Sequence, residues 1–408
     1  MQAGELLEII GNGENSGVEF KRDDIRPESL AKEIAAMANF QGGHVILGVE
    51  DDGSISGLKR EDTEEWVMNV ISQKVHPVIL PYYEEITVNG KKVAVITFPP
   101  GISKPYVVRE GGNEKIFIRV GSTSRPATRE QQMRLFEIGG ILHTETMPVA
   151  GTDISSLDRV RILNYLKDII RDPDIPQTEN EWESRLLGLG FLTESAGSIY
   201  CTIAGIVLFG KTPRRFLKQA GIRVFAFKEK DKEYDALMDE ILDGPLVGRF
   251  DFENHGKILL DRGLIERFTE AVKPFISKEE PGIDENFRRT TRWLWPYDAV
   301  REVIVNALAH RDWTRFVDIE VGIYSDRLEV ISPGSLPNSM TVEKMIAGQR
   351  SPRNTIIMEV LRDYGYVDHR GMGIRTKVIP LMKSINETEP LFENTEDYLK
   401  TVLYKKIE

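Results

Sequence analysis

The sequence contains one cysteine, no long apolar run and no excess of basic residues. The single cysteine, Cys201, excludes an internal disulfide framework and is typical of a reducing cytoplasm. The longest apolar runs, such as Val45-Ile46-Leu47, are too short to cross a bilayer, and no basic segment followed by an apolar one opens the chain. We therefore expect a cytoplasmic protein without a membrane segment.

The charge balance is acidic. A net charge of −11 and an isoelectric point near 5.3 argue against a protein that coats nucleic acid without specificity. A local basic groove is still compatible with this balance. With 408 residues, of which 41% are hydrophobic and 29% charged, the chain has a globular composition and enough length for two or three domains.

Hydrophobic periodicity divides the chain into three regions of mixed α/β and α+β character. Residues 1–138 alternate strands with helices, 150–215 form a helical connector, and 216–408 combine helices with an antiparallel hairpin. Residues 181–200 could alternatively form a small winged helix-turn-helix. The predicted helices cover 27–40, 61–75, 156–168, 256–272 and 374–382. The predicted strands cover 18–21, 44–49, 115–120, 198–202, 222–227, 317–324 and 328–331, with a hairpin over 85–98 about Asn89-Gly90.

Glu302, Asn306 and His310 stand four residues apart, so on a helix they lie along one stripe. The residues between them are apolar on most sides, which indicates a buried helix. A line of carboxylate, amide and imidazole on such a helix needs polar partners. Water, a metal ion or the phosphates of a ligand could supply them.

Two glycine motifs lie downstream of this stripe. Ser332-Pro333-Gly334 directly follows a predicted strand, and Gly371-Met372-Gly373 precedes a predicted helix. A Gly-x-Gly sequence before a helix lets backbone N–H groups approach a phosphate at the positive helix N-terminus. The stripe and the glycines together predict a phosphate site.

Residues 301–312 resemble the N-box of the gyrase, MutL and histidine-kinase ATPase superfamily, in its divergent branch with a RecG-like C-terminal domain. That branch is also similar in three short motifs, at 332–337, 351–354 and 370–374. The resemblance implies a Bergerat-type α/β sandwich that binds ATP with Mg²⁺ (or Mn²⁺). The Asp that the superfamily places before its first glycine motif is absent here, so the resemblance does not extend to adenine selectivity.

Residue roles in that site also follow from the resemblance. Asn306 would help hold the metal ion, and Glu302 would position or activate the attacking water. Gly371 and Gly373 would line the phosphates, and the cofactor-binding set is completed by His310 and Gly334. In the alternative reading Glu302 pairs with a neighbouring arginine and the module is degenerate.

A second group of charged residues lies near the N-terminus. Glu19 and Lys21 share one face of a predicted strand, Glu14 precedes it, and Asp51 ends the next strand. If these strands are neighbours, three carboxylates and a lysine converge. Such a cluster binds Mg²⁺ or Mn²⁺, which can activate water against a phosphodiester. The alternative is a Glu19–Lys21 surface pair of little energetic value and a turn at Asp51.

The surrounding residues resemble the Schlafen/Alb-like nucleic-acid-binding domain. The matching stretches are Glu14-x4-Glu19-Phe20-Lys21, residues 35–49, residues 51–57 and residues 118–123. In Schlafen nucleases a similar Glu…Glu…Asp set cleaves structured RNA. The resemblance maps Glu14 and Glu19 onto that set, with Asp51 as the preferred third member and Asp52 or Glu50 as alternatives.

A short basic stretch follows the last strand of this region. Arg119, Ser122 and Arg125 could contact phosphates, since such side chains position a nucleic-acid backbone without reading its sequence. The alternative is a solvated loop.

The leading hypothesis is a nucleic-acid-binding regulatory protein gated by ATP and Mg²⁺ in its C-terminal module. The first alternative is a metal-dependent endoribonuclease that acts on structured RNA, and the second is a non-catalytic interaction protein with degenerate sites. The partners would be DNA or RNA, and the superfamily resemblance implies pairing into a homodimer.

Overall fold

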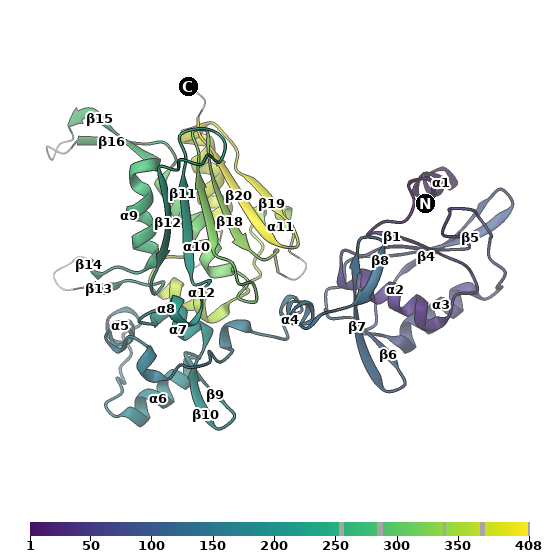
Figure 1. The fold of residues 1–408 in the computed structure, drawn as a ribbon, viewed down its shortest axis with the longest axis horizontal. Helices are drawn as coiled ribbons and strands as arrows, with labels where there is room; N and C mark the ends of the chain where they lie inside the picture. The colour runs from purple at the N-terminus through teal and green to yellow at the C-terminus, as the bar shows by residue number, and fades with distance from the viewer. Residues whose placement is uncertain (253–256, 284–288, 338–339, 368–371, 407–408) are drawn as a thin grey trace. The chain divides into compact units, whose positions relative to one another are not determined.

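The computed structural model describes residues 1–252, 257–283, 289–337, 340–367 and 372–406 (Figure 1). The contacts within the chain divide it into two compact units, Met1–Leu142 and His143–Glu408. Each unit combines helices with strands, so the expected α+β class is confirmed. Within these described ranges, no helix is long and apolar enough to span a membrane.

A four-stranded sheet forms the centre of the first unit. Its order is β1 (Val18–Lys21), β2 (Gly43–Leu47), β5 (Lys91–Phe98) and β4 (Tyr82–Val88). β1 and β2 are parallel because helix α2 (Pro27–Asn39) carries the chain back between them. β4 and β5 are antiparallel and join at Asn89 and Gly90, whose φ angles of 51° and 79° are left-handed, as a two-residue hairpin turn requires. The hairpin predicted there is confirmed.

The two faces of this sheet pack against different helices. On β2, Val45 and Leu47 belong to a core with α2 and α3 (Thr63–Lys74), whereas Ile46 belongs to a core with α1 (Ala3–Asn12). Successive side chains of a strand point to opposite faces, so a strand covered on both sides is apolar throughout.

A second sheet completes the first unit, and it brings residues 107–126 next to α2, although they are distant from α2 in the sequence. Its order is β3 (Val75–His76), β6 (Val107–Glu110), β7 (Asn113–Val120) and β8 (Thr123–Pro126), and α4 (Arg129–Ile138) follows. β7 packs against α2. This packing places Arg119 of β7 and Ser124 of β8 beside Glu33 of α2.

A six-stranded sheet forms the centre of the second unit. Its order is β12 (Met238–Asp243), β11 (Gly221–Ala226), β17 (Ile319–Ile323), β18 (Arg327–Pro333), β20 (Tyr398–Tyr404) and β19 (Leu391–Asn394). Only the β11–β17 pair among these is parallel. Helix α9 (Leu264–Ile276) packs on β11 and β12, helix α10 (Tyr297–His310) packs on β18, and the two helices contact each other. The strands predicted at 222–227, 317–324 and 328–331 are thus β11, β17 and β18.

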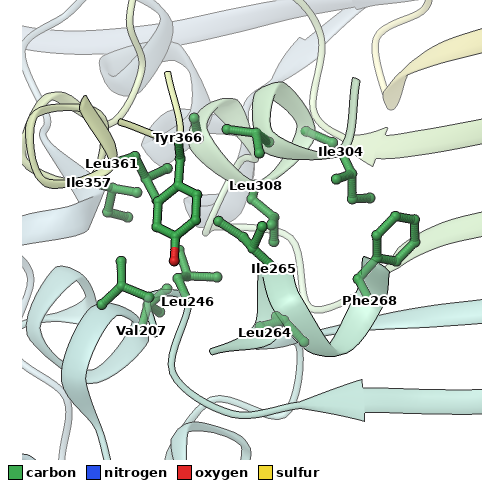
Figure 2. Packing of buried hydrophobic residues seen from close by; sticks show 14 of the residues in the cluster. Val207, Leu246, Leu264, Ile265, Phe268, Ile304, Leu308, Ile357, Leu361 and Tyr366 are labelled. Atoms are coloured by element: carbon green, nitrogen blue, oxygen red, sulfur yellow. The ribbon is translucent and has the colours of Figure 1, made fainter. Parts of the chain in front are cut away.

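The segment between the first unit and this sheet packs into the same hydrophobic core. Figure 2 shows Val207 of α7 (Ile203–Phe209) in one cluster with residues of α9, α10 and α12 (Thr355–Asp363). The other elements of the segment are η1 (Thr144–Thr146), η2 (Ile154–Ser156), α5 (Arg159–Asn164), η3 (Tyr165–Ile169), α6 (Glu179–Gly188), β9 (Leu192–Ser195), β10 (Ser198–Cys201) and α8 (Pro213–Phe216). A helix followed by a hairpin, α6 and then β9–β10, is compatible with the winged-helix alternative, which stays a prediction.

The helix predicted over 256–272 is wrong in its first half. Ile258–Asp261 form strand β14, which pairs with β13 (Arg249–Asp251), and α9 begins only at Leu264. The Gly263 N–H donates to the Glu266 side chain at 2.9 Å and so fixes the start of the helix. Short apolar runs are ambiguous between helix and strand.

The remaining elements are β15 (Ser277–Ile283), β16 (Arg289–Trp293), α11 (Val342–Ile346), η5 (Ile374–Val378), α13 (Ile379–Leu381) and η6 (Met382–Asn386).

Candidate functional site

The polar stripe of α10 lines a cavity in the second unit. α10 buries Ile304 and Leu308 in the core, where they pack in the cluster of Figure 2. Glu302, Asn306 and His310 lie along the side of the helix that lines the cavity. The four-residue spacing therefore presents a carboxylate, an amide and an imidazole to one enclosed space.

Glu302 and Asn306 hold each other in place. The Asn306 Nδ2 donates to the Glu302 carbonyl oxygen at 2.8 Å and to Glu302 Oε1 at 3.1 Å. Glu302 is only 4% exposed, and its Oε2 lies 3.8 Å from the Lys377 Nζ. Because the amide nitrogen faces Glu302, the Asn306 Oδ1 is the atom left to bind a ligand or a cation.

His310 stands at the last turn of the same helix. Burial, together with the positive charge of Arg353, lowers the pKa of His310 to about 4. The imidazole is therefore neutral at pH 7 and can act as one donor and one acceptor toward a ligand.

Two of the three glycines predicted to approach a ligand line the cavity. Gly334 has a φ of +100°, and a β-carbon there would collide with Arg353 and Asp312. A β-carbon at Gly373 would overlap the Glu302 carboxylate, so η5 begins close to α10 only because residue 373 has no side chain. Gly371 lies outside the described residues.

The rest of the cavity wall is mainly apolar. The cavity measures about 160 Å³, whereas one water molecule needs only ~10–15 Å³ of such space. Its size therefore allows a ligand larger than water. Apolar side chains that line it outside the predicted motifs are Val330, Met340, Met345, Met358, Val367, Phe392 and Leu399.

Sequence reasoning missed two cations in the wall, Arg350 and Arg362. Arg362 lines the cavity from α12, one turn after Met358. Its Nε is buried, and the described part of the chain offers that atom no hydrogen-bond partner. A guanidinium in the lining of a cavity favours an anionic ligand. The helical spacing of Met358 and Arg362 was visible in the sequence, but the face on which α12 meets the cavity was not.

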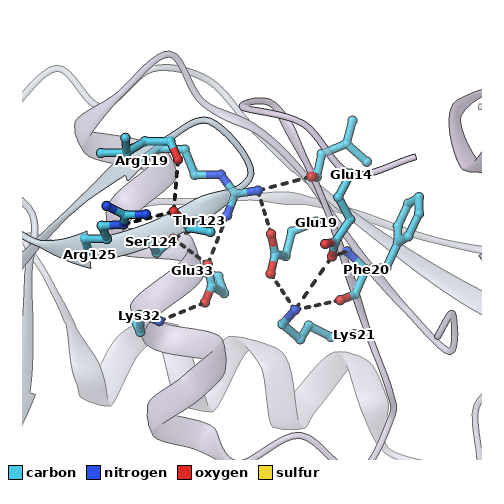
Figure 3. Close-up of polar contacts among 12 residues, drawn as sticks. Glu14, Glu19, Phe20, Lys21, Lys32, Glu33, Arg119, Thr123, Ser124 and Arg125 are labelled. Carbon is cyan, nitrogen blue, oxygen red and sulfur yellow. Dashed lines mark hydrogen bonds and ion pairs between the residues drawn. The ribbon is translucent and has the colours of Figure 1, made fainter. Parts of the chain in front are cut away.

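A second polar cluster lies in the first unit (Figure 3). Lys21 pairs with Glu19, and its Nζ lies 3.8 Å from Glu14. The guanidinium of Arg119 is fully buried and lies 2.5 Å from Glu19 and 3.1 Å from Glu33. The cluster thus combines three carboxylates with an ammonium and a guanidinium, from β1, the turn before it, α2 and β7.

Burial dominates the electrostatics of this cluster. It raises the pKa of Glu19, assisted by the negative charge of Glu33 and opposed by Lys21 and Arg119. Burial alone would lower the pKa of Lys21, but its hydrogen bond to Glu19 and the charges of Glu19, Glu14 and Glu33 raise it. The geometry, with one buried carboxylate beside one partly exposed ammonium, is that of a partly buried ion pair.

The predicted metal cluster of Glu14, Glu19 and Asp51 does not form. Within the described ranges of the chain, no group of three His, Cys, Asp or Glu side chains lies close enough together to hold a metal ion. Asp51 is exposed in the turn after β2, and Asp52 accepts from the Ser54 N–H at 2.9 Å as part of that turn. The physical reason is that Arg119 and Lys21 supply the positive charge at Glu19.

The predicted phosphate contact of the basic stretch is wrong for Arg119 and stays a prediction for Ser122 and Arg125. Arg119 cannot contact a phosphate while its guanidinium is buried against Glu19 and Glu33. Ser122 and Arg125 are exposed, and Arg125 Nε donates to the Thr123 hydroxyl at 3.2 Å. Sequence reasoning missed Glu33, and it placed Ser124 in the solvent-facing basic stretch, whereas the Ser124 hydroxyl donates to Glu33 at 2.5 Å and joins β8 to α2.

Matches to known families indicate a nucleic-acid-related protein with an ATPase-like module. Residues 14–128 match the family described as "Schlafen, AlbA_2". Residues 317–403 match the family described as "Putative ATP-dependent DNA helicase recG C-terminal". Two separate parts of the chain thus match a Schlafen/AlbA_2 family and a RecG-like C-terminal family, in the order that the motifs implied.

Two solved structures are similar to the chain. The DIP2311 protein of Corynebacterium diphtheriae is 22% identical with a TM-score of 0.43, over 96% of this chain and 75% of that one. The N-terminal domain of a RecG-related protein of Nitrosomonas europaea is 23% identical with a TM-score of 0.26, over 31% of this chain and 94% of that one. No curated protein matches the sequence.

Proposed function

We propose that this chain is a cytoplasmic nucleic-acid-binding regulatory protein whose second unit binds ATP with Mg²⁺ and thereby gates the first unit. The observation that supports this most directly is the cavity on α10, where Glu302, Asn306 and Gly373 line one wall together with Arg362. The first unit would contact the phosphate backbone of DNA or RNA through exposed groups such as Arg125.

The residues of the cavity fit a nucleotide and a divalent cation. The Asn306 Oδ1 is an oxygen ligand of the kind that Mg²⁺ accepts, and Arg362 offers its N–H groups to phosphate oxygens. Met345 and Met358 suit the base, because thioether sulfur packs well against aromatic rings. Bound Mg²⁺ would neutralise phosphate charge, and the Glu302 carboxylate would orient a water molecule.

Gating needs a ligand that distinguishes two arrangements of the second unit. The cavity is lined by α10, α12 and the start of η5, so a nucleotide that touches all three favours one arrangement of these helices. A ligand shifts an equilibrium by its difference in affinity for the two states. Nucleic-acid affinity of the whole chain should therefore change when Mg·ATP is present.

Thermal unfolding with Mg·ATP, and with ATP and EDTA, tests the binding step. At a hundredfold excess over Kd a ligand stabilises its protein by about 2.7 kcal/mol, which raises the melting temperature measurably. Asn306→Ala should abolish this shift, whereas Asn69→Ala, an exposed asparagine on α3, should preserve it. No shift in the unsubstituted chain would overturn the proposal. Equal nucleic-acid affinity with and without Mg·ATP would overturn the gating step alone.

A ribonuclease is the second candidate, because Glu14, Glu19 and Lys21 do lie together. Their arrangement with Arg119, whose guanidinium already neutralises Glu19, does not fit a metal ion. Transfer RNA incubated with the protein and Mn²⁺ should stay intact if the cluster is structural. Cleavage that Glu19→Gln abolishes would instead support the nuclease.

Two further proposals concern a non-catalytic role and the oligomeric state. A non-catalytic interaction protein is supported if neither Mg·ATP nor RNA changes the behaviour of the chain. Pairing into a homodimer is measured by sedimentation velocity with and without Mg·ATP, and a single monomeric species in both would contradict it.

A further inference from the structure

Glu145 stands at the start of the second unit, three residues after the first unit ends. Its side chain is 0% exposed. Its Oε1 accepts from the Thr355 hydroxyl at 3.0 Å and from the Ile356 N–H at 2.9 Å, and its Oε2 accepts from the Ile357 N–H at 3.0 Å. These are groups of the first turn of α12, more than two hundred residues away in the sequence.

The contact is a helix cap supplied from elsewhere in the chain. The first N–H groups of a helix have no partner within the helix, and a carboxylate there is also favoured by the helix dipole. The N-cap residue of α12, Asn354, makes no side-chain bond to its own helix. Glu145 therefore supplies the cap that Asn354 does not.

Asn354 instead ties α12 to α10. It is 1% exposed, and its Nδ2 donates to the carbonyl oxygens of Ala309 and Arg311 at 3.0 and 2.9 Å. These carbonyls belong to the end of α10, where unpaired C=O groups need donors. The N-terminus of α12 is thus bonded to the segment of Glu145 on one side and to the end of α10 on the other.

Both helices contribute to the cavity. Asn306 and His310 stand in the last turns of α10, and Met358 and Arg362 follow the capped turn of α12. A ligand held between these side chains fixes the distance between the two helices. A change in that distance would move the first turn of α12, whose Ile356 and Ile357 N–H groups donate to Glu145.

The other end of the Glu145 segment is also anchored. The Ile203 N–H donates to the Met147 carbonyl at 3.1 Å, and the Val149 N–H donates to the Cys201 carbonyl at 2.8 Å. Residues 143–149 therefore lie between α12 and the hairpin that leads into α7, and they continue directly into the first unit.

We propose that Glu145 is a positioning residue that couples occupancy of the α10–α12 cavity to residues 143–149, the chain segment that joins the two units. The inference rests on the proposed nucleotide binding and names the contact through which the second unit would act on the first. Glu145 bonds the start of α12, and Asn354 bonds the same helix end to α10, so a continuous chain of hydrogen bonds links the cavity helices to residues 143–149.

Hydrogen exchange of the full chain, measured with and without Mg·ATP, tests the coupling. In the unsubstituted chain Mg·ATP should slow exchange at least tenfold in 297–310, in 354–363 and in 143–149. Glu145→Gln should keep the first two effects and lose the third, because one carboxylate oxygen becomes an N–H₂ that cannot accept from Ile357. A merely structural role for Glu145 would not separate these segments.

Thr355→Val is the matched control, since it removes only the hydroxyl bond to Glu145 and leaves both backbone bonds. It should retain the protection of 143–149. If Glu145→Gln does not fold, Glu145→Asp keeps the charge but shortens its reach, and should weaken that protection. The inference is overturned if Mg·ATP still protects 143–149 fully in the Glu145 variant. It is also overturned if bound Mg·ATP does not protect 143–149 from exchange in the unsubstituted chain.

The unliganded protein separates this inference from the proposed function. If Mg·ATP gives no shift in melting temperature, the nucleotide proposal fails. The coupling is then decided by Glu145→Gln without ligand, which should speed exchange at least tenfold both in 143–149 and in 306–310. Faster exchange confined to 355–357 would show a local cap and sink the coupling.

Discussion

Gly373 lies directly against the carboxylate of Glu302, so closely that a β-carbon at residue 373 would overlap the Glu302 Oε1. Gly373 immediately precedes η5 and Glu302 belongs to α10, so two segments far apart in the sequence meet at the lining of the cavity. A glycine is required here by space, not by backbone angle, because the φ of Gly373 is an ordinary helical −54°.

Gly373→Ala should therefore destabilise the second unit and remove nucleotide binding. Forcing an extra methyl into a packed contact costs about 1–3 kcal/mol. Gly188→Ala is the matched control, since a β-carbon there meets nothing within 4 Å. It should be neutral or stabilise by about 0.4–1 kcal/mol. Urea unfolding measures both, and equal stability of the two variants would contradict the close contact.

Arg362→Ala should weaken nucleotide binding at least tenfold with little change in stability. The side chain has a buried Nε without a described partner, so its removal breaks no internal bond of that atom. Isothermal titration with Mg·ATP and with adenosine in the same Mg²⁺ buffer tests this, because loss of a phosphate contact should affect only the first ligand. Lys383→Ala, at an exposed pair with Glu389, serves as control.

His310 should make the second unit sensitive to acid. Its pKa in the folded chain is about 4, below the ordinary 6.5, so the unfolded chain binds the proton first. Stability should fall as the pH drops from 6.5 toward 4, by up to about 3 kcal/mol at ~1.4 kcal/mol per unit. His310→Gln should flatten this part of the curve. Stability that rises over the same interval would contradict the assignment.

Arg119→Ala should unfold or strongly destabilise the first unit. It leaves the buried carboxylates of Glu19 and Glu33 without their shared cation, and such losses cost about 3–5 kcal/mol. Arg125→Ala should leave stability unchanged and weaken nucleic-acid binding with a smaller salt dependence. Urea unfolding and anisotropy titrations at two salt concentrations separate these roles. A stable Arg119→Ala variant would show that the cluster is not a structural ion pair.

The sequence predicted local patterns well and tertiary neighbours poorly. The stripe on α10 and the hairpin at Asn89-Gly90 depend on spacing within a few residues, so periodicity and turn chemistry reveal them. Arg119 and Glu19 are separated by a hundred residues, and nothing local indicates that β7 places a guanidinium where a metal ion was expected. The role of Glu145 was not predictable for the same reason, because its three partners all lie in α12, more than two hundred residues away.

The helix error has a different cause. The run Ile258-Leu259-Leu260 is apolar in every position, so it fits a strand as well as a helix, and pairing with β13 decides between them. Intrinsic propensity is a weak guide where tertiary pairing competes.

The shared core of the second unit determines where the chain can be cut. Val207 and Phe209 of α7 pack with α9 and α12, so a fragment that begins at residue 216 would leave apolar helix faces open to water. The stretch recognised by the RecG-like family, 317–403, is shorter still and omits α10 with its Glu and Asn. The smallest fragment that we expect to fold and be expressed by itself therefore begins at residue 143. A fusion protein that uses this module would need residues 143–408 in full.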